Sequence, residues 1–327
     1  MIRVAITGVG GAAGVCCIKA LKMADKSYRI VGLDANPLSA GLYLAKKGYV
    51  IPSASDKTFI KKLLKITTKE KIDILIPTVD EELLSLAKTK EKFERNGTVV
   101  AVSDLTTIKT TNDKWLTCKK LSQANIPVPK AWRAPLSLTD LQKIKKEMPV
   151  IVKPRVGRGA RNIYLCNNKA ELKFALNKVT NPIIQEHLPG TEHTTDTLSN
   201  LQSKALIAVP RRRIETKFGV TWRGIIEHNT KIENTCKKAA ETLGIIGPAC
   251  IQTKKSEDGT SKVFEVNPRI GGTTTLSVAA GINIPHLTVK LFRHEKVNIP
   301  TKFEEKAICR YFEDVILEPE KLTEMVK

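Results

Sequence analysis

Short apolar segments alternate with longer polar or amphipathic segments along the first third of the chain. Apolar runs at residues 2–8, 28–36, 72–78 and 99–103 predict strands, and the segments at 15–24 and 57–71 predict helices between them. Short apolar strands separated by helices of about ten residues or more are typical of a parallel sheet with helices on both faces. We therefore predict a doubly wound α/β unit at the N-terminus.

The rest of the chain has a less regular pattern. A helix capped by Asn112 or Asp113 is predicted to end at Asn125, because Pro127 prevents its continuation. The pattern then predicts helices at 169–178 and 233–243 and strands at 149–154, 162–166, 183–188, 205–210, 224–228, 249–253 and 263–267. This is an α+β arrangement, and we divide the whole chain into three domains at residues 1–110, 111–205 and 206–327.

Composition is that of a globular protein. Apolar residues make up 42% of the 327 residues and charged residues 27%, and no apolar run approaches the ~20 residues of a membrane span. The first eight residues have the pattern of a buried strand rather than of a signal peptide, so we expect a cytoplasmic protein with no membrane partner. The seven cysteines contain no C-x-x-C spacing, which argues against a zinc site and a disulfide framework.

The net charge is the unusual bulk property. The chain has 54 Lys and Arg against 33 Asp and Glu, a formal charge of +21 that would suit nucleic acid or an anionic small molecule. However, the basic residues are spread along the chain, and aromatic residues, on which bases stack in single-strand binders, make up only 5%. Solvated lysine-rich helices explain the charge better than a nucleic-acid-binding surface does.

The segment VFEVNPRIGG, residues 263–272, carries the strongest candidate chemistry. A hairpin centred on the turn dipeptide Asp258-Gly259 pairs Gln252 with Glu265. Gln252, Glu265 and Asn267 then project from one face of the hairpin, because side chains alternate along a strand and directly opposed residues lie close together.

Such a group of oxygen donors suits a hard cation. Gln252, Glu265 and Asn267 are the kind of ligands that hold Mg²⁺ when phosphates complete its coordination. Arg269 would project beside this metal and hold a negative group with two hydrogen bonds. The alternative is a polar strand that faces solvent.

A second candidate is the segment IVKPRVGRGARN, residues 151–162. Lys153 ends an apolar strand, and Gly157 and Gly159 form a loop whose backbone can approach a ligand closely. The loop also carries Arg155, Arg158 and Arg161. This is the outline of a phosphate-covering loop, although it lacks the G-x-x-x-x-G-K-[ST] pattern; an ordinary basic surface hairpin is the alternative.

A third candidate is the segment IIQEHLPGTEHTTD, residues 183–196. Here Glu186 and the backbone of Leu188 could contact an adenine edge, and Glu192 could contact ribose hydroxyls. Taken alone this pattern is weak.

In their order and spacing these segments resemble the ATP-grasp enzymes, most closely the carbamoyl-phosphate-synthase large-subunit type. The resemblance covers essentially the whole chain and includes ITGVGGAAG, GLDANP and LIPTVDEE near the N-terminus, and QEHLPGTE and FEVNPR further on. It implies a Rossmann-like pre-ATP-grasp domain followed by a two-lobed ATP-grasp domain. The synthase subunit has two ATP-grasp units whereas this chain has room for one, so carbamoyl phosphate synthesis by this chain alone is not expected.

The resemblance also implies roles for individual residues. Lys114 and Lys153 would contact nucleotide phosphates under the glycine loop of Gly157 and Gly159, in which Ala160 and Arg161 stand where the family often has adjacent glycines. Glu186 and Leu188 would hold adenine, and Glu192 the ribose. Two Mg²⁺ ions, or Mn²⁺ in their place, would be held by Gln252, Glu265 and Asn267, and Arg269 with Lys153 would be catalytic.

The N-terminal glycine turn offers a rival prediction. Gly8, Gly10 and Ala13 fit G-x-G-x-x-A between a strand and a helix, and Asp34 ends the next strand where a ribose-binding acid lies in an NAD-binding domain. The five histidines show no pattern that proposes a catalytic group for a dehydrogenase. The resemblance explains the glycines without NAD, because pre-ATP-grasp domains share this topology.

Arginines near residue 212 are candidates for binding an acidic second substrate. In a strand, Arg211 and Arg213 point to one side and Arg212 to the other. They either line the cleft or form a charged edge that discourages strand pairing. Arg223 and the threonines at 273–275 are further candidates.

We therefore predict an ATP-dependent ligase that joins a small-molecule carboxylate to an amine, or to a thiol, through an acyl phosphate. Positioning and electrostatics supply most of such catalysis, so no side-chain nucleophile is required. An NAD-binding oxidoreductase and a non-catalytic ATP-binding regulator remain as alternatives. The sequence does not name the substrates, and a homodimer would agree with the general frequency of twofold oligomers.

Overall fold

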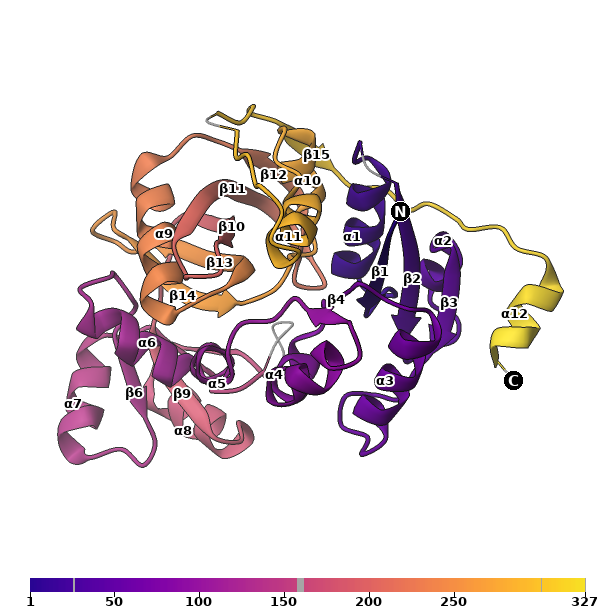
Figure 1. The fold of residues 1–327 in the computed structure, drawn as a ribbon. Coiled ribbons are helices and arrows are strands. Elements are labelled where there is room, and N and C mark those ends of the chain that lie inside the picture. Colours follow the sequence, from indigo (N-terminus) through magenta and orange to yellow (C-terminus); the bar gives the residue numbers. More distant parts are fainter. Residues whose placement is uncertain (26, 158–161, 301, 327) are drawn as a thin grey trace.

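The computed structural model describes residues 1–25, 27–157, 162–300 and 302–326. These residues form three β-sheets with helices packed around them (Figure 1). One sheet is parallel and lies at the N-terminus, and the other two are antiparallel. The predicted fold class, an α/β unit followed by α+β lobes, is confirmed.

The N-terminal sheet has the order β3-β2-β1-β4-β5 and is parallel throughout. Its strands are β1 (Ile2–Thr7), β2 (Tyr28–Asp34), β3 (Lys47–Val50), β4 (Ile74–Ile76) and β5 (Val99–Val100). The strand order reverses between β1 and β4, and in open parallel sheets ligands bind beyond the carboxyl ends of the strands at such a point. The turns after β1 and β4 are therefore well placed to face a ligand.

The helices around this sheet follow its strands in the chain. They are α1 (Ala12–Lys22), α2 (Ala40–Leu44), α3 (Phe59–Lys69), α4 (Asp80–Glu94) and α5 (Leu105–Asn112). Helix α3 shows why they pack as they do, because Phe59, Leu63 and Ile66 lie on one face and are buried. The next helix, α6 (Lys114–Gln123), packs instead against strands of both antiparallel sheets. The predicted cap of α6 is confirmed, since the Asp113 side chain accepts hydrogen bonds from two backbone N–H groups of its first turn.

A small antiparallel sheet has the order β6-β9-β7-β8. It contains β6 (Ala131–Arg133), β7 (Val150–Pro154), β8 (Tyr164–Cys166) and β9 (Pro182–Glu186), with α7 (Leu138–Lys146) and α8 (Lys169–Lys178) beside it. A separate apolar cluster around Trp132, Val152 and Leu172 forms its core. This lobe is therefore packed largely by itself.

The large antiparallel sheet has the order β14-β13-β10-β11-β12-β15. Its strands are β10 (Glu192–Ser199), β11 (Ala205–Lys217), β12 (Val220–Ile226), β13 (Gly247–Lys255), β14 (Ser261–Asn267) and β15 (Ala307–Cys309), and the helices of this region are α9 (Thr230–Leu243), α10 (Thr275–Ala279), α11 (Ile284–Phe292) and α12 (Pro319–Val326). The change from the small to the large sheet falls between β9 and β10, whereas the pattern placed a domain boundary at residue 205. The three-domain division itself stays a prediction.

The N-terminal unit and the large sheet share one apolar core. Helix α1 packs against α10 and α11, and the same cluster contains Ile6 and Ile18 of the N-terminal unit and Leu198, Leu276 and Leu287 of the C-terminal region. A second cluster fills the other face of the parallel sheet, under α3 and α4. The docking of the two units therefore rests on continuous apolar packing.

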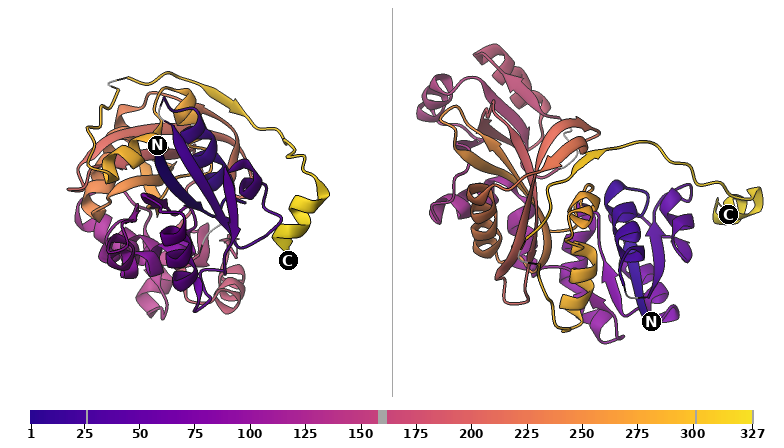
Figure 2. Two further views of the ribbon diagram at one scale, coloured as in Figure 1. Left: turned by 45° about the vertical axis from the view of Figure 1, so that its right-hand side comes forward. Right: turned by 90° about the horizontal axis from the view of Figure 1, so that it is seen from above.

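The chain after β15 runs back over the N-terminal unit. Figure 2 shows this segment as an arc that ends in α12, on the side of the N-terminal unit that faces away from the large sheet. Met325 of α12 lies against Gly48 of β3. In the described ranges, no helix has both the length and the apolar character needed to span a bilayer.

Candidate active site

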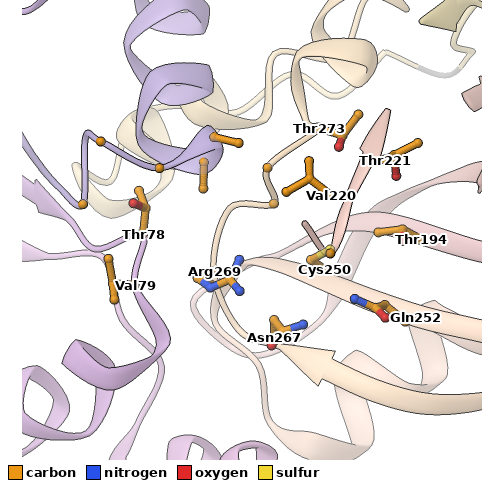
Figure 3. Close-up of a pocket in the computed structure, with 18 of the residues that line it drawn as sticks. Thr78, Val79, Thr194, Val220, Thr221, Cys250, Gln252, Asn267, Arg269 and Thr273 are labelled. Carbon is orange, nitrogen blue, oxygen red and sulfur yellow. The ribbon is translucent and has the colours of Figure 1, made fainter. Parts of the chain in front are cut away.

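Two cavities meet at the end of the β13–β14 hairpin. The larger, of about 820 Å³, lies between the N-terminal glycine turn and the large sheet, and the smaller, of about 120 Å³, lies beside the glycine loop after β7. Asn267 lines both cavities, Gln252 lines the larger and Glu265 the smaller. Figure 3 shows the larger cavity, with Arg269 between the segment of Thr78 and Val79 and the strands that carry Asn267 and Gln252.

The predicted hairpin register is confirmed at the site. Gln252 lies opposite Glu265, and Cys250 lies opposite Asn267. Nearer the turn, Thr253 pairs with Val263, so Phe264 is an extra residue that forms a bulge in β14. The hairpin is thus not symmetric about Asp258-Gly259 along its whole length, and the bulge places Glu265 opposite Gln252.

The side-chain oxygens of this hairpin, which could act as metal ligands, have few hydrogen-bond partners. The Asn267 amide donates to Glu265 Oε1 at 3.2 Å, and the Gln252 side chain makes no hydrogen bond to any residue that the structure describes. One carboxylate and two amides are too few for Mg²⁺ alone but fit a site completed by phosphate oxygens. Across the described ranges no group of three or more His, Cys, Asp or Glu side chains could hold a metal.

Lys153, at the end of β7, reaches the same hairpin. Its side chain is buried, and Nζ lies 5.3 Å from the centroid of the Phe264 ring. Burial is the main cause that lowers the pKa of Lys153 from 10.5 to about 8; the carboxylate of Glu265 opposes this shift and the charge of Lys114 adds to it. A partly desolvated ammonium beside a carboxylate can bind phosphate strongly.

Lys114 and Gly157 lie together on the smaller cavity. Lys114 Nζ donates to the Gly157 carbonyl at 2.7 Å, and its backbone N–H donates to the Arg155 carbonyl at 3.0 Å. Arg155 in turn forms an ion pair with Asp113, which caps α6. The start of the glycine loop is therefore held by the first turn of α6, while Gly159, with Arg158, Ala160 and Arg161, lies outside the described residues.

The predicted adenine and ribose residues do not line either of these cavities. Both oxygens of Glu186 accept from Lys262 Nζ, at 2.7 and 2.8 Å, and Glu186 also accepts from the backbone N–H of Lys130. Leu188 is buried, and Glu192 accepts from Arg213 Nη1 at 2.5 Å. Lys262 thus joins β9 to the strand that carries Glu265, which the sequence did not reveal.

Arg269 is held by a partner that the pattern missed. Its Nε and Nη2 donate to the two oxygens of Asp80, at 2.7 and 2.6 Å, and its Nη1 donates to the Ile270 carbonyl at 3.0 Å. Asp80 is the first residue of α4, a helix that the pattern did not predict. The acidic run VDEE, residues 79–82, was a signal for this position, because carboxylates favour the first turn of a helix.

The arginines near residue 212 divide as the strand pattern predicts. Arg211 and Arg213 line the larger cavity, as does Thr273, whereas Arg212 pairs with Glu227 outside it. Arg211 is fully buried and paired with Asp196 at 2.8 Å, so its charge is already neutralised. Its Nε, like that of Arg213, has no acceptor among the described residues.

Arg223 does not join this group. Its side chain is 57% exposed, lies away from both cavities and pairs with Glu215 of the neighbouring strand at 2.6 Å. Its expected place on the substrate side is therefore not supported, because it belongs to the exposed part of the β11–β12 pair.

The N-terminal glycine turn lines the larger cavity, but its acid is occupied. Asp34 accepts from the backbone N–H of Gly10 at 2.6 Å, from that of Asn36 at 2.9 Å and from Ser39 Oγ at 2.9 Å. A Cβ on Gly10 would lie 2.2 Å from Ser39 Oγ, so this glycine permits packing within the unit. Asp34 therefore acts as a support for the turn rather than as a free ribose-binding acid.

Two family models match the chain. One, described as ATP-grasp in the biosynthetic pathway with Ter operon, matches residues 178–315, and the other, the PylC-like N-terminal domain, matches residues 4–101. The chain is thus an ATP-grasp superfamily protein with a PylC-like N-terminal domain.

Two curated proteins are similar in sequence. A carbamoyl-phosphate synthase of Methanobrevibacter smithii is 23% identical over 265 residues, which is 76% of this chain and 70% of that protein. A D-alanine–D-alanine ligase of Fusobacterium nucleatum subsp. nucleatum is 28% identical over 158 residues, 44% of this chain and 53% of the ligase. The chain is therefore a distant homologue of the carbamoyl-phosphate synthases.

The fold has a solved counterpart. The biotin carboxylase domain of the Hydrogenobacter thermophilus 2-oxoglutarate carboxylase, solved as a dimer with magnesium ADP, ADP and bicarbonate, superposes with a TM-score of 0.77 at 16% identity, over 95% of this chain and 74% of that one. At this identity the likeness concerns the fold. ATP-grasp proteins use ATP with Mg²⁺ and act on small molecules as ATP-dependent ligases or carboxylases.

Proposed function

We propose that this protein is an ATP-dependent ligase that activates a carboxylate as an acyl phosphate and joins it to an amine. The observation that carries the proposal is the position of Gln252, Glu265 and Asn267. These uncommitted oxygen donors lie next to Lys153 at the boundary of the two cavities. Phosphoryl transfer depends on positioning and on neutralising the charge of the phosphates, and a cation site with a lysine beside it would supply both.

The smaller cavity is the phosphate end of the nucleotide site in this proposal. Lys114 and Gly157 line it. Lys153, at the end of β7, does not line the cavity itself, but its charge is close enough to interact with Glu265 and Lys114. Glu265, Asn267 and Gln252 would hold Mg²⁺, which when bound supplies charge neutralisation to the phosphates. Glu186 and Leu188, at the end of β9, are proposed for adenine and Glu192 for ribose, on the strength of the sequence resemblance.

The larger cavity is proposed to take the carboxylate substrate. The first residues of α1 face it, as do Arg213 and Arg269, so one part of its wall carries N–H groups that can bind an anion. The carboxylate oxygen attacks the γ-phosphorus of ATP, and ADP leaves. Arg269 and Lys153 would stabilise the charge on the transferred group, which is the main catalytic requirement.

The second half-reaction uses the same cavity. The nitrogen of an amine attacks the acyl carbon, the C–O bond to phosphate breaks, and inorganic phosphate leaves with its electron pair. A thiol in place of the amine would give a thioester by the same route. A volume of about 820 Å³ has room for both substrates in succession.

Trapping with hydroxylamine tests the proposal without knowledge of the amine. The protein is incubated with Mg-ATP, a panel of amino acids and other carboxylates, and hydroxylamine, and ADP and hydroxamate are measured. We expect one carboxylate class to give stoichiometric ADP and hydroxamate. Glu265→Gln should reduce the rate by about 10²–10³-fold, the range for removing one preorganised charge-stabilising group.

Glu257→Gln is the matched control, because Glu257 is exposed near the turn of the same hairpin and should be silent. Binding of Mg-ATP with no ADP release for any carboxylate would favour the non-catalytic ATP-binding regulator. Absence of Mg-ATP binding would refute both.

A further inference from the structure

An ion pair joins the N-terminal unit to the end of the hairpin. Asp80 and Arg269 are 189 residues apart in the chain, yet two hydrogen bonds of 2.7 and 2.6 Å connect them. The exposed fractions of the two side chains are 16% and 15%. Burial, the largest single influence, lowers the pKa of Arg269, but the charge of Asp80, its hydrogen bonds and smaller charge effects together outweigh burial, so the pKa is raised.

The pair stands where the two cavities meet. Asp80 lines the smaller cavity together with Lys114 and Glu265, and Arg269 lines the larger one. Under the proposed function the phosphoryl group passes across this boundary. The pair is therefore next to the path of the transferred group.

The Asp80 carboxylate occupies the part of Arg269 that would bind that group. Three of the five guanidinium N–H groups already donate, two to Asp80 and one to the Ile270 carbonyl. The paired face formed by Nε and Nη2 is the one that holds a phosphate or carboxylate with two parallel hydrogen bonds. An incoming phosphoryl group can use this face of Arg269 only if Asp80 moves away.

The pair is not needed to dock the two units. Helix α1 already packs on α10 and α11 through the shared apolar core. Asp80 also has a place to retain its charge after release, because it lies in the first turn of α4, where the helix dipole and free N–H groups stabilise a carboxylate. Exchange of Asp80 for another anion is therefore chemically reasonable.

We propose that Asp80 is a positioning residue that acts through Arg269, holding the guanidinium at the cavity boundary until a phosphoryl anion displaces the carboxylate. The inference rests on the proposed function and adds to it the residue that controls access to Arg269. It makes Asp80 a competitor of the phosphoryl group. Removal of its charge must then raise the affinity of the site for phosphate.

The test uses inorganic phosphate as the probe. Its dissociation constant is measured by calorimetry with the full-length protein saturated with Mg-ADP, for the wild type, Asp80→Asn and Arg269→Lys. If the free guanidinium is populated at about one tenth in the wild type, Asp80→Asn should bind phosphate about tenfold more tightly. Arg269→Lys should lose this phosphate binding, and Asp80→Asn should then give no gain in the double variant.

Asp73→Asn is the control. Asp73 receives two hydrogen bonds from the Arg3 side chain, at 3.1 and 2.9 Å, and one from the Arg3 backbone N–H at 2.8 Å. It lines neither cavity, so loss of its charge should leave phosphate affinity unchanged. Asp80→Ser, which remains compatible with a helix start, should show the same gain as Asp80→Asn and replaces it if the amide variant does not fold.

The outcomes are distinguishable. Equal phosphate affinity in wild type and Asp80 variants that bind Mg-ADP normally overturns the inference alone. A gain that persists in the double variant also overturns it, because the gain would not pass through Arg269. A wild type that does not bind Mg-ADP overturns the proposed function and the inference together.

Discussion

Two strand ends face the larger cavity from opposite sides, and they differ in how their polar groups are used. At the end of β14, Glu265 has Asn267 as its sole hydrogen-bond partner among the described residues, and the Gln252 side chain opposite has none. At the end of β2, Asp34 accepts three hydrogen bonds from its own unit, two from backbone N–H groups and one from Ser39. The side-chain oxygens at the end of β14 therefore have few partners and can bind a ligand. The carboxylate at the end of β2 already has hydrogen-bond partners within its own unit.

The difference separates a ligand site from a scaffold. Partly buried polar groups without partners cost stability, so a protein that keeps several of them together is prepared to bind something there. Asp34 needs no ligand, because its contacts hold the glycine turn against the following loop. This contrast favours the ATP site over NAD binding more strongly than either motif does by itself.

The largest expected effect is on nucleotide binding near the end of β14. Lys153→Met removes a charged donor to phosphate, and such a contact is worth about 1.5–3 kcal/mol, so Mg-ADP should bind roughly 10- to 100-fold more weakly. Calorimetric titration measures the effect. Lys173→Met, an exposed position on α8 of the same lobe, is the control, and unchanged affinity in Lys153→Met would remove this lysine from the phosphate site.

The next effect is on the stability of the N-terminal unit, where glycines allow the turn after β1 to pack against α1. A Cβ on Gly14 would lie 2.4 Å from the Gly8 carbonyl oxygen, whereas a Cβ on Gly11 would meet that oxygen at 3.5 Å, an ordinary contact. Gly14→Ala should therefore destabilise the protein by about 1–3 kcal/mol, and Gly11→Ala by much less. Urea unfolding of the two variants compares them, and equal losses would contradict a packing role for Gly14.

A smaller effect on stability is expected for replacing Asp34. Asp34→Asn keeps the shape of the side chain but replaces one accepting oxygen by an amide that cannot accept, which should cost about 1–2 kcal/mol. NAD⁺ should not raise the melting temperature of the wild type, whereas Mg-ADP should. A stabilisation by NAD⁺ that Asp34→Asn abolishes would reverse the comparison and revive the oxidoreductase hypothesis.

The last prediction concerns the pH dependence of stability. The folded-state pKa of Lys153 is about 8, below the ordinary 10.5, so between these values the unfolded chain binds more protons than the folded protein does. The cost of burying the charged lysine is fully present below pH 8 and disappears as the pH rises toward 10.5, so stability rises over this window.

Lys153→Met lacks this titration. It should exceed the wild type in stability at pH 7, and the gap should narrow between pH 8 and 10.5 in urea unfolding without nucleotide. A constant gap would mean that Lys153 titrates normally in the folded protein.

Local patterns predicted much of the fold but not every element. The strand at 183–188 and the helix at 169–178 are where the pattern placed them, because apolar periodicity reports burial on one face. Strand β10 was missed. It is rich in threonine, and residues Thr194, Thr195 and Thr197 are buried through their central position between β11 and β13. Sequence polarity gives no sign of such burial.

The sequence by itself determined the fold class and the two local arrangements at the site, because alternation and turn chemistry are local properties. It placed Gln252, Glu265 and Asn267 together on one face of the hairpin. It also placed Arg211 and Arg213 on the same side of their strand. Only the tertiary structure decided which charges are already neutralised. The partners of Arg269, Glu186 and Arg211 are Asp80, Lys262 and Asp196, and they come from other elements of the fold. Such pairings depend on how distant segments pack, and no periodicity along the chain encodes them.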